Sequence, residues 1–316
     1  MKILITGGAG FIGSNLAKKL MDRKDKVVLI DNFNDYYDPK LKQDRIKKYL
    51  KGYDFKLYKG DIRDQKLLER IFKNEKIDKV MHLAAMAGVR YSLKDPFLYE
   101  DVNIKGTMNL LEMSAKYKIK NFVFASSSSV YGNNKKMPFS ETDSVDTPIS
   151  PYAATKKCTE LIAHVYSHIY GLNVSGLRFF TVYGPWGRPD MALFSFTSNI
   201  LDGKAIDVYN RGKMSRNFSY IDDIVSGIIA VLDKPAKYEI YNIGGDKEET
   251  LMRYIEVLEE NLGQKAKKNL LPMQPGDVPS TCADIKKLRK LGWKPATRIE
   301  EGIKNFVDWY KEYYKI

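Results

Sequence analysis

The sequence predicts an α/β fold, a doubly wound parallel sheet followed by a smaller, mixed α/β C-terminal lobe. Three observations support this prediction. Five short apolar segments alternate with helix-like segments over the first 125 residues. A glycine-rich turn joins the first apolar segment to the helix after it. After about residue 180 the alternation gives way to turn-rich sequence, and 316 residues are enough for two lobes.

The first turn is the strongest local signal. Strand-like residues 3–6 run into G-G-A-G-F-I-G, and a helix is expected to continue through about residue 21. Gly7, Gly10 and Gly13 have a spacing that allows a tight turn, close approach of backbone to a pyrophosphate and packing of helix on strand. A second strand at 27–30 ends in Asp31, placed to hold the ribose diol of NAD and repel the 2′-phosphate of NADP. Together these features predict an NAD site.

The following segments continue the same rhythm. Residues 32–51 are polar and aromatic, then basic and helical, and strands are expected at 55–59, 79–83 and 122–125, with helices at 65–74 and 96–117. Ligands of such sheets bind beyond the carboxyl ends of the strands. Asp61 follows the third strand and can face an adenine, and the small residues at 84–88 allow close approach to phosphates. The fifth strand ends in S-S-S-S-V-Y-G, so these hydroxyls are expected in the crevice.

The segment S-P-Y-A-A-T-K at 150–156 is expected to begin a helix, with Ser150 as its cap and Pro151 in its first turn. Tyr152 and Lys156, four residues apart, then share one face. A tyrosine has a pKa of about 10, so it accepts a proton near pH 7 only if that pKa falls by about 3 units. A nearby ammonium and a bound cationic nicotinamide have the required sign. We therefore expect Tyr152 to take a proton from a sugar hydroxyl.

Composition excludes several classes of protein. Two cysteines, Cys158 and Cys282, give no disulfide framework or cysteine zinc site, which fits a reducing compartment. No apolar run reaches the ~20 residues of a membrane span, and the first strand leaves no room for a signal peptide. The net charge of +13 comes from scattered lysine pairs with acids between them, which favours a solvated surface over nucleic-acid binding. A cytoplasmic protein without a bound metal is expected.

Beyond residue 180 a second lobe is expected to bind the substrate. A strand at 174–179 precedes the turn-rich segment 181–190, a helix at 192–201 and a strand at 206–209. A helix at 222–232 and a strand at 239–242 look like a return to the first lobe, and the residues from 250 read as helices. The predicted boundaries are 1–180 with about 217–245 for the NAD-binding domain, and 181–216 with 246–316 for the substrate domain.

The motifs T-G-G-A-G-F-I-G, H-L-A-A, S-S-V-Y-G, Y-x-x-x-K and R-F-F-T-V-Y-G-P occur in an order that resembles the NAD-dependent nucleotide-sugar epimerase/dehydratase family of extended short-chain dehydrogenases/reductases. The resemblance covers nearly the whole chain and implies a Rossmann-like fold and a homodimer. It implies a catalytic trio of Ser127, Tyr152 and Lys156. The implied cofactor contacts are Gly7, Gly10, Phe11, Ile12, Gly13, Asp31, Asn32, Asp61, Ile62, Leu83, Ala84, Ala85, Ala87, Asn103, Tyr152, Lys156 and Phe180. The implied substrate contacts are Arg90, Ser127, Ser128, Ser129, Thr181, Arg188, Arg216 and Asp277.

The reaction implied by the resemblance is removal of hydride from C4 of a nucleotide sugar while Tyr152 takes the hydroxyl proton. Dehydratases of this type place Asp-Glu where this chain has Ser128-Ser129, and serine has no accessible pKa for that acid–base work. The remaining outcome is return of hydride to the other face, which is 4-epimerisation. UDP-glucuronate decarboxylation and a non-catalytic NAD-binding module are the more distant alternatives.

The substrate expectation comes from N-F-N-D-Y-Y-D-P, A-G-V-R-Y-S and G-R-P-D-M-A, which resemble UDP-glucuronate 4-epimerases. A uronate needs a cation near its carboxylate; Arg188 is the first candidate and Arg90 the second. The alternative for Arg188 is a salt bridge with Asp190 in its own loop. UDP-glucose or UDP-N-acetylhexosamine 4-epimerisation is the alternative activity. Gln274 and Met86 depart from the residues of similar proteins.

Overall fold

The computed structural model describes residues 1–316, and its centre is a seven-stranded, fully parallel sheet. The strand order is β11-β6-β5-β4-β1-β2-β3. Their bounds are β1 Lys2–Thr6, β2 Lys26–Asp31, β3 Phe55–Lys59, β4 Lys79–His82, β5 Asn121–Ser127, β6 Val174–Phe179 and β11 Tyr238–Ile243. The predicted doubly wound fold is therefore confirmed.

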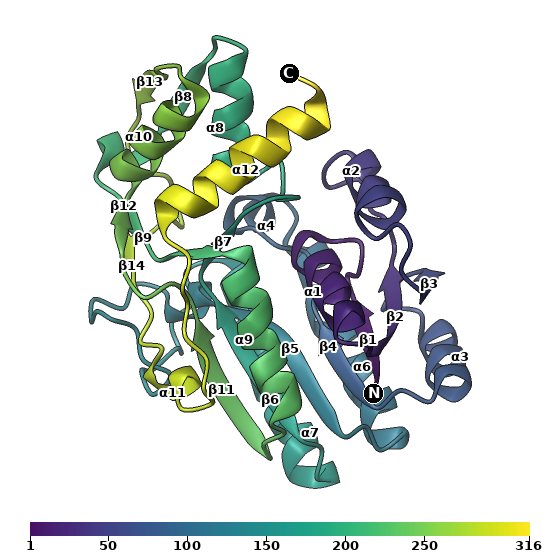
Figure 1. The fold of residues 1–316 in the computed structure, drawn as a ribbon. Helices are drawn as coiled ribbons and strands as arrows, with labels where there is room; N and C mark the ends of the chain where they lie inside the picture. Colours follow the sequence, from purple (N-terminus) through teal and green to yellow (C-terminus); the bar gives the residue numbers. More distant parts are fainter.

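Helices cover both faces of the sheet (Figure 1). The pair α1 (Phe11–Asp22) and α9 (Ile221–Asp233) packs together on one face. The other face carries α3 (Gln65–Glu75), α6 (Gly106–Lys116) and α7 (Pro151–Tyr170). The consecutive strand pairs β1–β2, β2–β3, β4–β5 and β5–β6 lie side by side and are joined by helical crossovers, which cover the apolar runs of the inner strands on both faces.

The helix expected at 96–117 is divided. Residues Pro96–Tyr99 form α5, Glu100–Lys105 form a π-helical turn, and α6 follows. The segment after β2 likewise holds α2 (Pro39–Asp44) and a π-helical turn at Arg45–Tyr49. A short helix, α4 (Val89–Lys94), was not expected from the sequence. Single π-turns cost hydrogen-bond geometry and are often found near functional sites.

The smaller lobe contains α8 (Ala192–Leu201), α10 (Leu251–Leu262), α11 (Lys286–Arg289) and α12 (Ile299–Tyr314). Its strands pair in short ladders: β8 (Ala205–Val208) with β13 (Lys267–Leu270), and β9 (Ser215–Arg216) with β12 (Glu249–Thr250) and β14 (Ser280–Thr281). A further parallel pair joins β7 (Thr181–Tyr183) to β10 (Phe218–Tyr220). The reading of residues beyond 250 as helices alone was wrong, because β13 and β14 are short and polar and carry no alternating apolar pattern.

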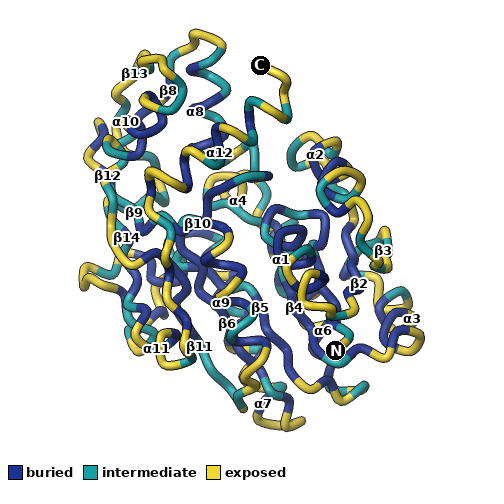
Figure 2. The backbone as a smooth tube through the Cα atoms, in the orientation of Figure 1, coloured by how far each residue is buried: buried dark blue, intermediate teal, exposed yellow.

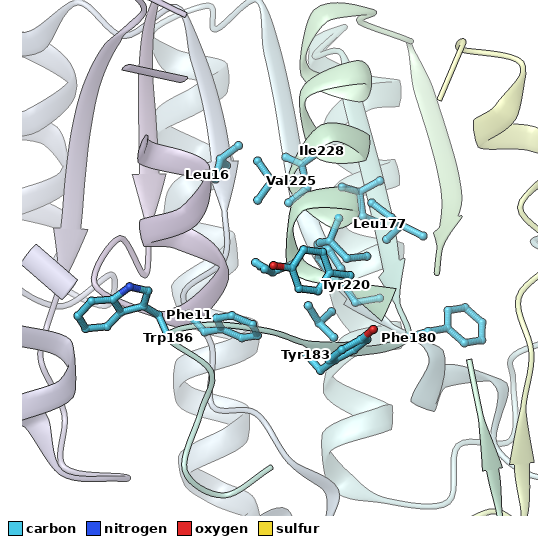
Figure 3. Packing of buried hydrophobic residues seen from close by; sticks show 14 of the residues in the cluster. Phe11, Leu16, Leu177, Phe180, Tyr183, Trp186, Tyr220, Val225 and Ile228 are labelled. Atoms are coloured by element: carbon cyan, nitrogen blue, oxygen red, sulfur yellow. The ribbon is translucent and has the colours of Figure 1, made fainter. Parts of the chain in front are cut away.

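Two hydrophobic clusters lie on opposite faces of the sheet. The larger one includes Phe11 and Leu16 of α1 together with Tyr254 of α10 and Phe306 of α12, so it extends into the smaller lobe. Figure 3 shows part of it, from Trp186 and Phe11 to Phe180. Most strands of the sheet are buried, but the edge strand β3 is largely exposed; the other exposed residues concentrate in the outer helices and loops (Figure 2). None of the helices combines the length and apolarity that crossing a membrane requires.

One buried ion pair fixes α7 on the sheet. Arg178 of β6 donates to Glu160 of α7 through Nε at 2.9 Å and a terminal nitrogen at 2.8 Å, and Ser126 donates to the same carboxylate at 2.6 Å. Both charged side chains are less than 5% exposed. Removing one partner of a buried pair leaves the other charge uncompensated.

Replacing Glu160 by glutamine should therefore lower the free energy of unfolding by about 3–5 kcal/mol. Urea denaturation followed by circular dichroism measures the change. Glu69→Gln is the matched control: its partner Lys116 and the carboxylate itself are about half exposed, so the loss should stay below about 1 kcal/mol. Equal losses in the two variants would contradict the assigned importance of the buried pair.

Candidate active site

The glycine turn between β1 and α1, called the cradle below, presents mainly backbone atoms at its surface. Gly7 has φ +68°, a left-handed conformation, and its N–H donates to the Ile30 carbonyl at 2.9 Å. A Cβ added at Gly13 would lie 2.2 Å from the Gly7 carbonyl oxygen, so α1 starts against the turn as only glycine permits. Such a turn at a helix N-terminus fits the pyrophosphate of a dinucleotide.

Asp31 stands at the end of β2, next to the cradle. Its carboxylate accepts from the Ala9 N–H at 3.0 Å and from the Phe33 N–H at 2.8 Å, which fixes its orientation. Beside it, Asn32 donates to Asp61 at 2.9 Å, and hydrogen bonds from Arg63 hold the pKa of Asp61 at about 2. The acid predicted from the sequence thus lies where a ribose diol is bound in this type of fold.

Two predicted cofactor residues turn their side chains into the core. Ile62 is buried against α6, where a Cβ at Gly106 would come within 2.4 Å of its Cδ1. The ring of Phe180 packs 6.4 Å from Phe139 and 6.5 Å from Tyr131. Contact of either residue with an adenine or nicotinamide would therefore have to use its backbone, which the sequence pattern did not reveal.

The loop 83–88 after β4 is held by side chains from three elements. Thr6 accepts from the N–H groups of Leu83 and Ala84, at 3.1 Å each, and lies 2.7 Å from His82. Burial lowers the pKa of His82 to about 3, so its ring is neutral. Leu83, Ala84, Ala85 and Ala87 remain partly exposed, whereas the side chain of Met86 is buried in the core.

Asn103 has a different role from the one expected. Its amide accepts from the Met86 N–H at 2.8 Å and donates to the Met86 carbonyl at 3.0 Å and to Thr155 at 3.1 Å. These three bonds tie the π-helical turn to the loop after β4 and to α7. The structure therefore gives Asn103 a positioning role toward this loop, in place of the direct cofactor contact inferred from its sequence position.

The four consecutive serines divide between two environments. Ser126 points into the core, where it bonds Glu160, and Ser127 ends β5 at 7% exposure. The Ser127 hydroxyl accepts from the Ser129 N–H at 3.1 Å and lies 3.1 Å from the Ser129 hydroxyl. Ser128 and Ser129 are partly exposed and start a short 3₁₀ turn. Ser127, Ser128 and Ser129 thus lie together at the carboxyl end of β5.

Tyr152 and Lys156 occupy the first turns of α7, which Ser150 caps by accepting from the Ala153 N–H at 3.1 Å. Lys156 is 5% exposed and donates to the Ala125 carbonyl at 2.8 Å, and its ammonium lies 6.0 Å from the centre of the Tyr152 ring. Burial lowers the pKa of Lys156 to about 8. Burial also raises the pKa of Tyr152, opposed by the Ser127 hydroxyl and by the charge of Arg188.

The pKa of the Tyr152 phenol is thus raised in this chain, and the lowering expected from Lys156 together with a bound cationic nicotinamide stays a prediction. Desolvation of the phenolate outweighs the nearby charges, because the ammonium is held by a backbone carbonyl rather than by the phenol oxygen. A further positive charge next to the phenol is needed before Tyr152 can act as a base near neutral pH.

The buried ammonium of Lys156 gives a pH-dependent stability. Its pKa is about 8 in the folded chain and about 10.4 when unfolded, so between these values the unfolded chain binds more protons and stability rises with pH. Below pH 8 the burial cost is fully present. Lys156→Met should raise the free energy of unfolding by up to about 3 kcal/mol at pH 7, with a smaller difference at pH 9.5. Urea unfolding at both pH values, with Lys157→Met as control, measures this; a loss of stability at both would contradict it.

Arg188 lies in a loop that reaches the same crevice. It pairs with Asp190, with Nε 3.0 Å from one carboxylate oxygen, and its charge acts on the Tyr152 phenol. A cavity between the lobes is lined by Phe11 of α1, Thr181 of β7 and Arg188, with apolar residues of α8, α10 and α12. The salt bridge considered for Arg188 is thus present, and the arginine also lines this cavity.

A second cationic cluster joins Arg90 of α4, in the larger lobe, to Arg216 and Asp277 of the smaller lobe. Arg90 is exposed, pairs with Asp277 at 3.3 Å and stacks 4.7 Å from the centre of the Tyr209 ring. Arg216 donates only to the Ser215 and Pro279 carbonyls, at 2.8 and 3.0 Å, and burial lowers its pKa. Asp277 and Arg90 both act on the charge of Arg216, so the three side chains form one group. Arg90 therefore belongs with Arg216 and Asp277, not with Tyr152.

The chain resembles known proteins over its whole length. A family model described as GDP-mannose 4,6-dehydratase matches residues 4–306. The chain belongs to this family. Protein CapI of Staphylococcus aureus is 50% identical over the whole of both chains, and UDP-glucuronate 4-epimerase 4 of Arabidopsis thaliana is 49% identical over 99% of this chain and 76% of its own. The family resemblance inferred from the motifs is confirmed.

Solved structures of similar proteins agree. The UDP-glucuronic acid 4-epimerase of Bacillus cereus, in complex with UDP-glucuronic acid and NAD, superposes with a TM-score of 0.93 at 37% identity, covering 99% of this chain and 100% of that one. The UDP-glucose 4-epimerase of Thermotoga maritima with UDP-glucose gives 0.90 at 32% identity, over 99% and 100% of the two chains.

In this member of the GDP-mannose 4,6-dehydratase family, several side chains that hold the site in place through hydrogen bonds were not predicted from the sequence. Thr6 and Tyr36 stand in the motifs T-G-G-A-G-F-I-G and N-F-N-D-Y-Y-D-P but were not predicted as site residues, and Arg45 was read only as part of a basic helical segment. Each acts through hydrogen bonds to residues far away in the chain, so no local pattern identifies it.

Proposed function

We propose that this chain is an NAD-dependent UDP-sugar 4-epimerase that interconverts UDP-glucuronate and UDP-galacturonate. The observation that carries the proposal is the position of Arg188, whose charge acts on the Tyr152 phenol and which shares a cavity with Thr181. A cation at the catalytic end of the cleft suits a sugar that carries a carboxylate. The B. cereus structure with UDP-glucuronic acid and NAD supports the same substrate and cofactor.

The cofactor assignment rests on the fit of the first lobe. The glycine cradle, whose Gly13 position leaves no room for a Cβ, would hold the pyrophosphate, and Asp31 would hold the adenosine ribose. When bound, NAD would supply the acceptor and donor of a hydride for C4 of the sugar and a positive charge in the site.

The chain's own groups handle the proton. Tyr152 takes the proton of the C4 hydroxyl and gives it back after the ring has turned, and the Ser127 hydroxyl hydrogen-bonds the phenol and the sugar oxygen. Lys156, held at 2.8 Å from the Ala125 carbonyl, keeps a positive charge on the same face of α7 and favours the phenolate. Ser128 and Ser129 have no acid–base capacity near neutral pH, which favours epimerisation over dehydration.

The nucleotide end of the substrate is assigned to the smaller lobe. Arg216 has no carboxylate partner and would bind the UDP pyrophosphate, while Asp277 would bind the ribose and Arg90 would support both. The domain boundaries expected from the sequence are proposed on the same basis, with residues 181–216 and 246–316 forming the substrate domain. We further propose a cytoplasmic location and a role in polysaccharide biosynthesis, supported by the similarity to CapI.

The direct test is incubation of the purified protein with UDP-glucuronate and observation of the products by NMR. Appearance of UDP-galacturonate without added coenzyme beyond NAD supports the proposal. The second candidate is UDP-glucose 4-epimerisation, favoured by the similarity to the T. maritima enzyme. Turnover of UDP-glucose in place of UDP-glucuronate would establish that alternative, and release of a UDP-pentose as the main product would indicate a decarboxylase.

A homodimer is proposed on the outer faces of α5, α6 and α7. Leu161, Val165 and Ile169 follow one another at four-residue spacing on α7, and all three are exposed, as are Phe97 of α5 and Met108 of α6. These helices contact one another, so the apolar side chains form one surface. Contiguous exposed apolar patches of this kind mark interfaces.

Introducing charge on this surface should separate the subunits. A Leu161→Glu/Val165→Glu double variant is expected to elute as a monomer in size-exclusion chromatography with light scattering, whereas the unaltered chain elutes as a dimer, because a buried unpaired carboxylate is unfavourable. Leu270→Glu, at an equally exposed position on β13 of the other lobe, is the control. A monomeric unaltered protein would refute the proposed dimer.

A further inference from the structure

Arg45 lies where three segments far apart in sequence meet. Its side chain is fully buried, and its guanidinium makes five hydrogen bonds. It donates to the Ala9 carbonyl of the glycine turn at 3.1 Å, to the Tyr37 hydroxyl at 2.7 Å and to the Gly187 carbonyl at 3.0 Å. Two further bonds reach the Trp186 carbonyl, at 3.1 and 2.6 Å. One side chain thus joins the cofactor cradle to the loop that carries Arg188.

All five hydrogen bonds end on neutral oxygens, four in number, and no carboxylate pairs with Arg45. A buried charge without a counter-charge is unfavourable for folding. The planar guanidinium can place several donors in fixed directions, whereas an ammonium presents only a compact charge. Burial of an arginine here therefore indicates that the fixed, planar arrangement of its N–H donors is needed to hold these backbone segments together.

The backbone that accepts hydrogen bonds from Arg45 has an unusual conformation at Trp186. Trp186 has φ +63°, a left-handed value that a bulky residue rarely adopts, and such conformations concentrate at functional sites. Its indole, visible beside Phe11 in Figure 3, lies 5.3 Å from each of Tyr49, Trp309 and Tyr313. The aromatic packing holds the side chain and Arg45 holds the carbonyl, two residues before Arg188.

The aromatic segment before α2 holds the other side of the same loop. The Tyr36 hydroxyl donates to Asp190 at 3.3 Å, and Asp190 is the ion-pair partner of Arg188. The Arg188 guanidinium also lies 5.6 Å from the centre of the Tyr36 ring. The segment N-F-N-D-Y-Y-D-P and the turn after it thus contact the backbone just before Arg188 and the counter-ion of Arg188.

We propose that Arg45 is a positioning residue that fastens the Arg188 loop to the glycine turn and so determines whether the site selects a uronate. The inference rests on the proposed function, in which Arg188 binds the sugar carboxylate. Displacement of a positioned group by about 1 Å costs about 100-fold in such sites. Loosening Arg45 should therefore affect sugars with a carboxylate far more than neutral sugars.

The experiment compares binding of UDP-glucuronate and UDP-glucose by calorimetry in the NAD-loaded protein. Arg45→Lys keeps the positive charge but removes the planar guanidinium with its several N–H donors. It should weaken the binding of UDP-glucuronate by about 10–100-fold, while the binding of UDP-glucose should change by less than about threefold. Tyr36→Phe keeps the ring and removes only the hydroxyl, and should give a smaller change in the same direction. Arg253→Lys, at an exposed surface arginine, is the matched control.

A double-mutant cycle separates positioning from general loss of structure. In an Arg45→Lys background, Arg188→Met should weaken UDP-glucuronate binding less than it does in the unaltered protein, because the arginine is already displaced. Additive losses, or equal losses for the two sugars in Arg45→Lys and Tyr36→Phe, would overturn the role of Arg45 while leaving the proposed function intact. An unaltered protein that neither binds nor converts UDP-glucuronate would remove the proposed function and this inference with it.

Discussion

Tyr152→Phe should reduce kcat for UDP-glucuronate by about 10³–10⁴-fold, with KM changed by less than about threefold. The substitution removes the only group placed to take the C4 proton, and it leaves the ring that packs against Tyr99 at 6.0 Å in place. Binding of the nucleotide depends on Arg216 and its neighbours in the other lobe, so it should persist. Product formation followed by NMR and binding followed by calorimetry separate the two effects.

The matched control for this variant is Tyr166→Phe on the same helix. The Tyr166 hydroxyl donates to Glu112 at 2.8 Å on the protein surface, so its loss should leave kcat within about twofold. Turnover by Tyr152→Phe at an undiminished rate would show that another group takes the proton, and the chain would then be better described as an NAD-binding protein whose tyrosine is structural.

Arg188→Met should lower kcat/KM for UDP-glucuronate by about 10–100-fold, the value of one or two charge-assisted hydrogen bonds. UDP-glucose, which carries no carboxylate, should be bound as before or slightly better. Parallel measurement of both substrates gives the selectivity ratio directly. Arg90→Met provides the comparison: because Arg90 stands with Asp277 and Arg216 at the nucleotide end, it should weaken both substrates to a similar extent.

The same variant also examines how the reactive intermediate is kept intact. The 4-keto uronate is a β-keto acid, and it loses CO₂ when its carboxylate turns out of the ring plane. We expect Ser128, Ser129 and Arg188 to hold that group in the plane, so Arg188→Met should release some UDP-pentose. Absence of any UDP-pentose from this variant, under conditions where it still converts UDP-glucuronate, would reject this function for the arginine.

The elements of the first lobe could be predicted from sequence because their signals are local. The strands at 55–59 and 174–179 have the bounds expected from apolar runs and turn residues, and so does the helix at 192–201 of the smaller lobe. The glycine turn and Asp31 are likewise contained in one β-α-β unit, whose geometry follows from the short segments themselves. Where the signal was weak, as in the polar strands β13 and β14, the prediction failed.

The sequence by itself determined the α/β architecture, the cofactor cradle and the helix that carries Tyr152 and Lys156, since each depends on residues a few positions apart. Only the tertiary structure decided that Asn103 holds a loop, that the charge of Arg188 acts on Tyr152 while Arg90 pairs with Asp277, and that Arg45 joins the glycine turn to the loop that carries Arg188. Arg45 and Trp186 are 141 positions apart, and their contact exists only after the sheet has brought both segments to one edge. The direction in which the Tyr152 pKa shifts is also decided by the tertiary structure, because desolvation of the phenol depends on all the groups packed around it.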